Sequence, residues 1–316
     1  MTSLIFFAQE HVVPAASGAA AEPFSPGELI IGHVSNSALS HPLIHLPTIL
    51  GIDFSVTKHV LMIWLVAALL FVGITTIVRR YVRQPVPVPA RPMAALEITV
   101  EFVRDQIVRP AVGTKWAAAW MPLLLTFFLF ILGANVIGLI PIFDVVGLLN
   151  HYVLHTSDEA FLARVVHGGT TATGNFNVTA ALAMITFGAI IVAGTRAHGF
   201  VQHWKNLVPH GLPGALYVLL IPLEIIGMLV RPFALTMRLA ANMTGGHIAI
   251  LAILSLVFVF AQMMQTSLAG IGVGVVFSLP LAVAISMLEI IVVLVQAYVF
   301  TLLSAVFIGM AIHAHH

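Results

Sequence analysis

The sequence predicts an all-α integral membrane protein with five transmembrane passes plus one amphipathic surface helix. Of its 316 residues, 60% are hydrophobic and 8% are charged, whereas about a quarter of the residues in an ordinary globular chain are charged. Several uncharged runs approach or exceed the roughly 20 residues that a helix needs to cross a bilayer. These runs are unbroken, whereas the strands of a membrane β-barrel alternate between polar and apolar residues. The pattern therefore favours helices.

The uncharged runs place the five passes, which begin near residues 59, 117, 178, 216 and 275. The runs are Val60–Val78, Ala117–Phe143, Val178–Gly194, Ile248–Leu288 and Ile290–Ile312. The fourth run is too long for one crossing, and Gly270–Gly274 and Pro280 within it predict a turn between two helices. We expect the last two helices to be long and tilted as a hairpin, because a helix from about residue 216 to residue 265 exceeds the bilayer thickness.

The connection between the first two passes predicts the amphipathic helix. Arg83–Pro92 is a proline-rich, stiff linker. After it, one helical face carries Met93, Leu96, Val100, Val103 and Ile107, and the other carries Glu97, Glu101, Arg104 and Asp105. A helix of this kind lies on a membrane surface, and we interpret it as a connector without chemistry.

The lysine and arginine residues predict the orientation, because these residues concentrate in cytoplasmic loops. More than half of them lie in segment 79–115, and Arg196 and Lys205 lie in segment 195–215. Segment 144–177 is mainly acidic. We expect the N-terminus outside and the C-terminus in the cytoplasm. The chain divides into an N-terminal extracytoplasmic arm at 1–55, partly disordered, and a membrane domain at 56–316.

The composition also excludes some functions. The chain has no cysteine, so disulfides and thiolate metal sites are unavailable. The net charge of +1 argues against a nucleic-acid partner. His313, His315 and His316 fit a solvated tail better than a metal site, and we expect no cofactor and no metal.

Four polar residues of the fourth pass share one face of the helix. Glu224, Arg231, Arg238 and Asn242 are separated by seven, seven and four residues, which are close to whole helical turns. Arg238 has apolar or small residues on both sides. A charge at mid-bilayer costs roughly 3 kcal/mol, and a guanidinium cannot lose its proton. We therefore expect Arg238 to face a cavity, a partner protein or an anion.

The fifth pass supplies complementary groups. Its only charge is Glu289, and Gln296 follows seven residues later on the same face. His247 points away from Arg238, next to Gly245 and Gly246, where glycine permits another backbone to come close. His247 and Glu289 are both titratable, and such a pair can pass a proton near neutral pH. A purely structural polar contact is the alternative interpretation.

The segment RPFALTMRLAANMTGGH, from Arg231 to His247, resembles the signature of subunit a of the F-type ATP synthase. Its arginine, apolar pair, small residue and asparagine correspond to the run from Arg238 to Asn242. The segment LEIIVVLVQAYVFTLLSAVFIGMA resembles the last helix of the family, with Gln296 at its glutamine, and ANVIGLIP and NFNVTAAL resemble its second and third spans. The match covers roughly residues 55–316. The chain departs from the family in its two central alanines, where many relatives have a bulkier pair.

The resemblance implies a stator subunit with two proton half-channels beside a rotating ring of c subunits. Arg238 resembles the essential arginine that faces the ring, and Gln296 resembles the glutamine near it. Asn242 and Glu224 resemble half-channel residues, and His247 and Glu289 occupy the positions of a titratable pair. The implied partners are the c-subunit ring, b-type peripheral stalk subunits, the soluble ATPase sector and the lipid bilayer. Such a subunit is not an enzyme on its own, and we expect it in a bacterial plasma (inner) membrane.

An ion-coupled secondary transporter is the main alternative function. Such folds usually contain internal repeats, and the sequence shows none. A haem-binding anchor is a weaker alternative, because it would need paired histidines within the spans and only His247 lies clearly within one.

Overall fold

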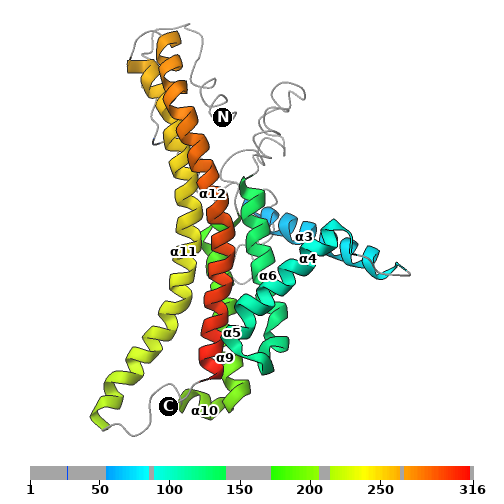
Figure 1. The fold of residues 1–316 in the computed structure, drawn as a ribbon. Helices are drawn as coiled ribbons and strands as arrows, with labels where there is room; N and C mark the ends of the chain where they lie inside the picture. The colour runs from blue at the N-terminus through cyan, green and yellow to red at the C-terminus, as the bar shows by residue number, and fades with distance from the viewer. Residues whose placement is uncertain are drawn as a thin grey trace. The chain divides into compact units, whose positions relative to one another are not determined.

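The computed structural model describes residue 27 and residues 55–84, 89–139, 172–205, 214–263 and 267–313. Within these residues, five helices are long and apolar enough to cross a membrane (Figure 1). They are α3 (Lys58–Val82), α6 (Thr114–Leu139), α9 (Phe176–His198), α11 (Gly214–Met263) and α12 (Ser267–Ile312). The predicted all-α membrane fold with five passes is confirmed. The arm predicted at 1–55 lies outside the described residues, apart from Gly27 and Ser55.

The turn predicted at Gly270–Gly274 and Pro280 is wrong. Helix α11 ends at Met263 and α12 begins at Ser267, so both features lie inside α12. Gly274 serves packing instead, because a Cβ at this position would lie 2.6 Å from the Cα of Val257 on α11. With 50 and 46 residues, α11 and α12 form the long hairpin that the sequence predicts (Figure 1). Their tilt in a bilayer stays a prediction.

The predicted amphipathic helix forms in three pieces: α4 (Arg91–Phe102), a π-helical segment (Val103–Val108) and α5 (Arg109–Val112). Helices α4 and α5 each have a proline in the first turn. At the start of α4 the missing N–H costs no helical hydrogen bond, whereas α5, which contains Pro110, follows the π-helical segment directly. Of the predicted apolar face, Val103 and Ile107 are fully buried and the earlier residues are half-buried. The placement of this connection on the membrane surface stays a prediction.

The charged side chains of this connection bind one another. Arg104 donates two hydrogen bonds to Asp105 at 2.9 and 2.8 Å, and Arg109 donates a third at 2.7 Å. The bonds from Arg104 lower the pKa of Asp105, and the same bonds raise the pKa of Arg104. Pairs this exposed add little stability, but they occupy both arginines.

The contacts within the chain divide it into two compact units. The first contains the described residues of Met1–Ile63, Val136–Ala172 and Asn242–Val292, and the second contains those of Trp64–Asn135, Thr173–Ala241 and Val293–His316. The main buried cluster belongs to the second unit, where α6, α9, α11 and α12 contribute Leu124, Ile190, Leu239 and Phe300. Phe127 meets Phe300 edge-on, with ring centroids 5.6 Å apart. This cluster fixes which faces of α11 and α12 point inward.

Small and hydroxyl-bearing residues allow the helices of the second unit to approach closely, as is usual in membrane proteins. Gly309 of α12 lies against the carbonyl group of Ala111. Thr186 of α9 and Ser304 of α12 share a buried hydrogen bond at 3.1 Å. His203 of α10 (Phe200–Lys205) lies over Gly194 of α9, and burial lowers the pKa of this histidine.

Three helix ends meet at one side of the second unit. The Nε2 atom of His198, at the end of α9, lies 2.9 Å from the carbonyl oxygen of Ile312, at the end of α12. A Cβ at Gly113, directly before α6, would lie 3.4 Å from the Nε2 atom of His313. The start of α6 and the ends of α9 and α12 therefore share one side, in agreement with the distribution of lysine and arginine. Which side of the membrane this is stays a prediction.

We expect Gly274→Ala to destabilise the chain by about 1–3 kcal/mol, as overpacking of a close contact does, because the new methyl group would meet the backbone of Val257. Gly272→Ala is the matched control, since nothing lies within 4 Å of a Cβ there. The measurement is the midpoint of thermal unfolding in detergent, followed by circular dichroism. Equal midpoints for the two variants would contradict the contact between α11 and α12 at Gly274.

Candidate functional site

Arg238 lies on the exposed part of α11, beside the face that enters the core. Leu235 and Leu239 are buried in the main cluster, with exposed fractions of 2% and 0%. Arg238 is exposed, and so are Ala234 and Ala241, one turn before and one turn after it on the same face. The guanidinium is therefore directed away from the chain's own core, and the small residues around it leave room for a neighbouring helix.

Gln296 occupies the matching part of α12 but is buried, with 4% of its surface exposed. Its neighbours Ala297 and Phe300 belong to the same cluster as Leu235 and Leu239, so this part of α12 packs with the part of α11 that carries Arg238. The close approach of the Gln296 side chain to Arg238 stays a prediction.

Glu224 and Arg231 form an ion pair about two to four turns closer to the start of α11 than Arg238. Arg231 Nη2 lies 3.4 Å from Glu224 Oε1, and the two side chains are 24% and 36% exposed. The Arg231 guanidinium also lies over the ring of Phe307 on α12, 5.7 Å from its centroid. The four residues of the predicted polar face thus divide into two pairs, because Glu224 and Arg231 form an ion pair, whereas Arg238 and Asn242 are exposed.

His247 and Glu289 lie together in the first unit. The Nδ1 atom of His247 is 3.8 Å from Oε1 of Glu289, and the two side chains are 28% and 5% exposed. This separation is longer than a hydrogen bond, and Oε1 has no hydrogen-bond partner among the described residues. An ionised carboxylate without donors is costly to bury. A small movement would bring the two groups into contact, so this arrangement can exchange a proton between them.

Gly246 provides the space that the Glu289 side chain occupies. A Cβ at Gly246 would lie 2.7 Å from Oε1 of Glu289, whereas nothing lies within 4 Å of a Cβ at Gly245. The sequence predicts a close approach at these glycines, and the structure places it at Gly246. The approaching group is a carboxylate rather than a backbone.

Some partners in the second unit could not be identified from the sequence. Asn135 accepts a buried hydrogen bond from Thr173, and Phe307 supplies the ring beneath Arg231. Helical spacing relates residues within one helix, and it carries no signal for a partner on another element. Within the described ranges, no group of three or more histidine or acidic side chains is arranged to hold a metal ion.

The chain is similar to proteins of one family along most of its length. The family model described as ATP synthase A chain matches residues 60–309. ATP synthase subunit a 2 of Chlorobium luteolum is 37% identical over 96% of this chain and 82% of its own length. Subunit a of Chloroherpeton thalassium is 38% identical over 87% and 72%, and that of Myxococcus xanthus is 38% identical over 84% and 75%.

We expect Gly246→Ala to displace the Glu289 carboxyl group, because the added methyl group would lie within 2.7 Å of its oxygen. The measurement is the carboxyl stretching band in infrared difference spectra, assigned to Glu289 by its loss in Glu289→Gln. The band should shift in Gly246→Ala and stay in place in the control Gly245→Ala. An unshifted band in Gly246→Ala would show that the two groups are not in contact.

Proposed function

Since the chain belongs to the ATP synthase A chain family, we propose that its helices form the stationary proton path of that complex, with Arg238 facing a rotating ring of c subunits. The chain is a multi-pass subunit of the membrane sector and acts within the complex rather than as an enzyme alone. The outward direction of Arg238 is the observation that carries the proposal. Family membership argues against the alternative of an ion-coupled secondary transporter.

Arg238 needs an anionic partner outside its own chain. It keeps its charge at any physiological pH, and the nearby exposed residues Phe233 and Met237 are apolar. A cation on such a surface is costly in lipid, and a carboxylate on a neighbouring subunit would offset that cost. A ring of c subunits would present such carboxylates one after another.

The arginine also sets the protonation state of the passing carboxylate. A c-subunit carboxyl group must be neutral while it faces lipid, because burying its ionised form is costly. Next to Arg238, the positive charge stabilises the ionised form and lowers the carboxyl pKa. The proton then leaves towards the exit half-channel. The fixed charge also blocks direct passage of protons between the two half-channels.

His247 and Glu289 form part of the entry half-channel in this proposal. Their separation of 3.8 Å and the burial of Glu289 support a proton relay, because both side chains can bind and release a proton and imidazole does so closest to neutral pH. Gln296, Asn242 and Glu224 line the path by virtue of their matching positions. Each charge that crosses 100 mV releases about 2.3 kcal/mol, so several crossings must combine to drive one ATP synthesis.

The remaining expectations concern placement and partners. The helix ends at Gly113, His198 and Ile312 would face the cytoplasm of a bacterial cell, with the N-terminus on the opposite side. At the membrane the chain would contact b-type stalk subunits, and through the complex it would be connected to the soluble ATPase sector. The enrichment of lysine and arginine near these helix ends supports this orientation.

We expect Arg238→Ala to abolish ATP-driven proton pumping while the complex still assembles, because the passing carboxylate would lose its fixed counter-charge. The measurement is the quenching of a pH-sensitive dye in inverted membrane vesicles, with subunit content checked by immunoblot. Arg196→Ala, which removes an exposed arginine at a helix end, should pump normally. Normal pumping by an assembled Arg238→Ala complex would refute the proposed role.

We expect His247→Glu and Glu289→His each to reduce pumping, and the double exchange to recover part of the loss, because the exchange retains one histidine and one carboxylate in the same space. The same vesicle assay measures all three variants. A double variant no better than either single one would count against a coupled pair and leave the structural interpretation of this contact.

A further inference from the structure

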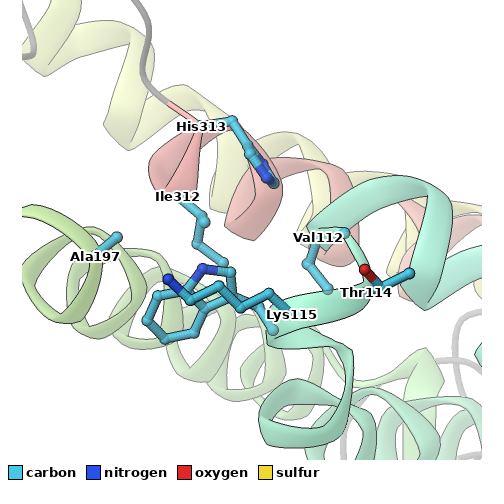
Figure 2. A pocket seen from close by; sticks show the side chains of 8 residues that line it. Val112, Thr114, Lys115, Ala197, Ile312 and His313 are labelled. Atoms are coloured by element: carbon cyan, nitrogen blue, oxygen red, sulfur yellow. The ribbon is translucent and has the colours of Figure 1, made fainter.

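A cavity of about 380 Å³ lies where the start of α6 meets the ends of α9 and α12. Its lining includes Thr114, Lys115 and Trp116 from α6, Ala197 from α9, and Ile312 and His313 from the end of α12. Figure 2 shows His313 and Ile312 on one side of it and Lys115 and Thr114 on the other. None of these residues takes part in the proposed proton path.

Lys115 supplies an uncompensated positive charge to this cavity. No carboxylate lies within ion-pair distance of it among the residues that the structure describes, whereas Arg104 and Arg109 are both engaged with Asp105. The Lys115 ammonium group lies 5.7 Å from the centroid of the Trp116 ring. The cavity therefore contains a cation held near its wall and available to an anion.

Backbone N–H groups beside Lys115 also favour an anion in this cavity. The N–H group of Ala117 donates a hydrogen bond to the carbonyl oxygen of Gly113, directly before α6. The N–H groups of Thr114, Lys115 and Trp116, which precede Ala117, have no partner within the helix. Gly113 has no side chain to cap them. These donors and the Thr114 hydroxyl group reinforce the attraction of Lys115 for a phosphate.

His313, on the opposite wall of the cavity, offers a hydrogen-bond acceptor. Its Nδ1 atom lies 3.0 Å from the carbonyl oxygen of Gly309. A carbonyl oxygen only accepts hydrogen bonds, so Nδ1 carries the proton and Nε2 of the neutral ring is an acceptor. This acceptor faces Gly113 and can receive a hydrogen bond from a hydroxyl group. The cavity thus suits a ligand with a phosphate at one end and a hydroxyl group at the other.

The membrane position decides which ligand meets this description. Lysine and tryptophan at the end of a spanning helix lie at the level of the lipid headgroups. We propose that the cavity binds the headgroup of an anionic phospholipid, whose phosphate contacts Lys115 and the first turn of α6 and whose hydroxyl group donates to Nε2 of His313. Phosphatidylglycerol carries both groups and is the probe for the test.

The test measures lipid binding to the full chain in detergent by native mass spectrometry. Phosphatidylglycerol should bind more tightly than phosphatidylcholine, whose headgroup has no net charge and no hydroxyl group. Lys115→Ala should weaken phosphatidylglycerol binding about fivefold, the effect of one lysine near an anionic lipid. Arg80→Ala removes an exposed cation at the end of α3 and should leave the affinity unchanged.

A second variant keeps the test decisive if Lys115→Ala does not fold. Ala197→Leu fills part of the cavity and retains every charge, so it should also weaken phosphatidylglycerol binding. Equal binding of the two lipids, or wild-type affinity in both cavity variants, would overturn the proposal. Millimolar inorganic phosphate that displaces the lipid from the wild-type chain but not from Lys115→Ala would assign the cavity to a free phosphate ion and overturn the lipid assignment.

Discussion

The packing of Leu235 and Leu239 into the main cluster determines how α11 presents its charges. Because these two side chains are buried, the arginine between them must lie outside the core, and it does so among small and apolar exposed residues. The burial of the two leucines thereby fixes the direction of Arg238, whose charge would be costly to leave in lipid without a partner. The proposed encounter with a carboxylate on another subunit depends on this arrangement.

The other polar groups of the described spans mostly find partners within the chain. Thr186 and Ser304 share a hydrogen bond, and Glu224 pairs with Arg231. Glu289 is buried next to His247 with one oxygen that has no hydrogen-bond partner, as is also true of polar atoms of Trp120, Asn135 and Ser278 among the described residues. The role of this pair in proton exchange therefore depends on the proposed path rather than on that oxygen.

Much of the fold could be predicted from the sequence, because long uncharged runs allow few alternatives to spanning helices. The boundary between α11 and α12 could not be predicted in this way. Glycine interrupts isolated helices, but at Gly274 it permits two helices to touch, and only the tertiary contact distinguishes the two roles. The same limit applies to the site. Periodicity within α11 predicts the shared face of Glu224, Arg231 and Arg238, whereas the space at Gly246 for Glu289 and the ring of Phe307 beneath Arg231 come from another helix.

The five spans found in the described part of the chain differ in how much they depend on one another, and this has a consequence for biogenesis. The first span has a mean hydropathy of 2.6 with 11% of its window buried, whereas the span in α11 has the lowest value, 1.7. The first can partition into lipid as it leaves the ribosome, with no other segment present. The arginine-bearing span inserts less readily alone, and its retention in the bilayer would be helped once α12, synthesised directly after it, covers the leucines beside its charge.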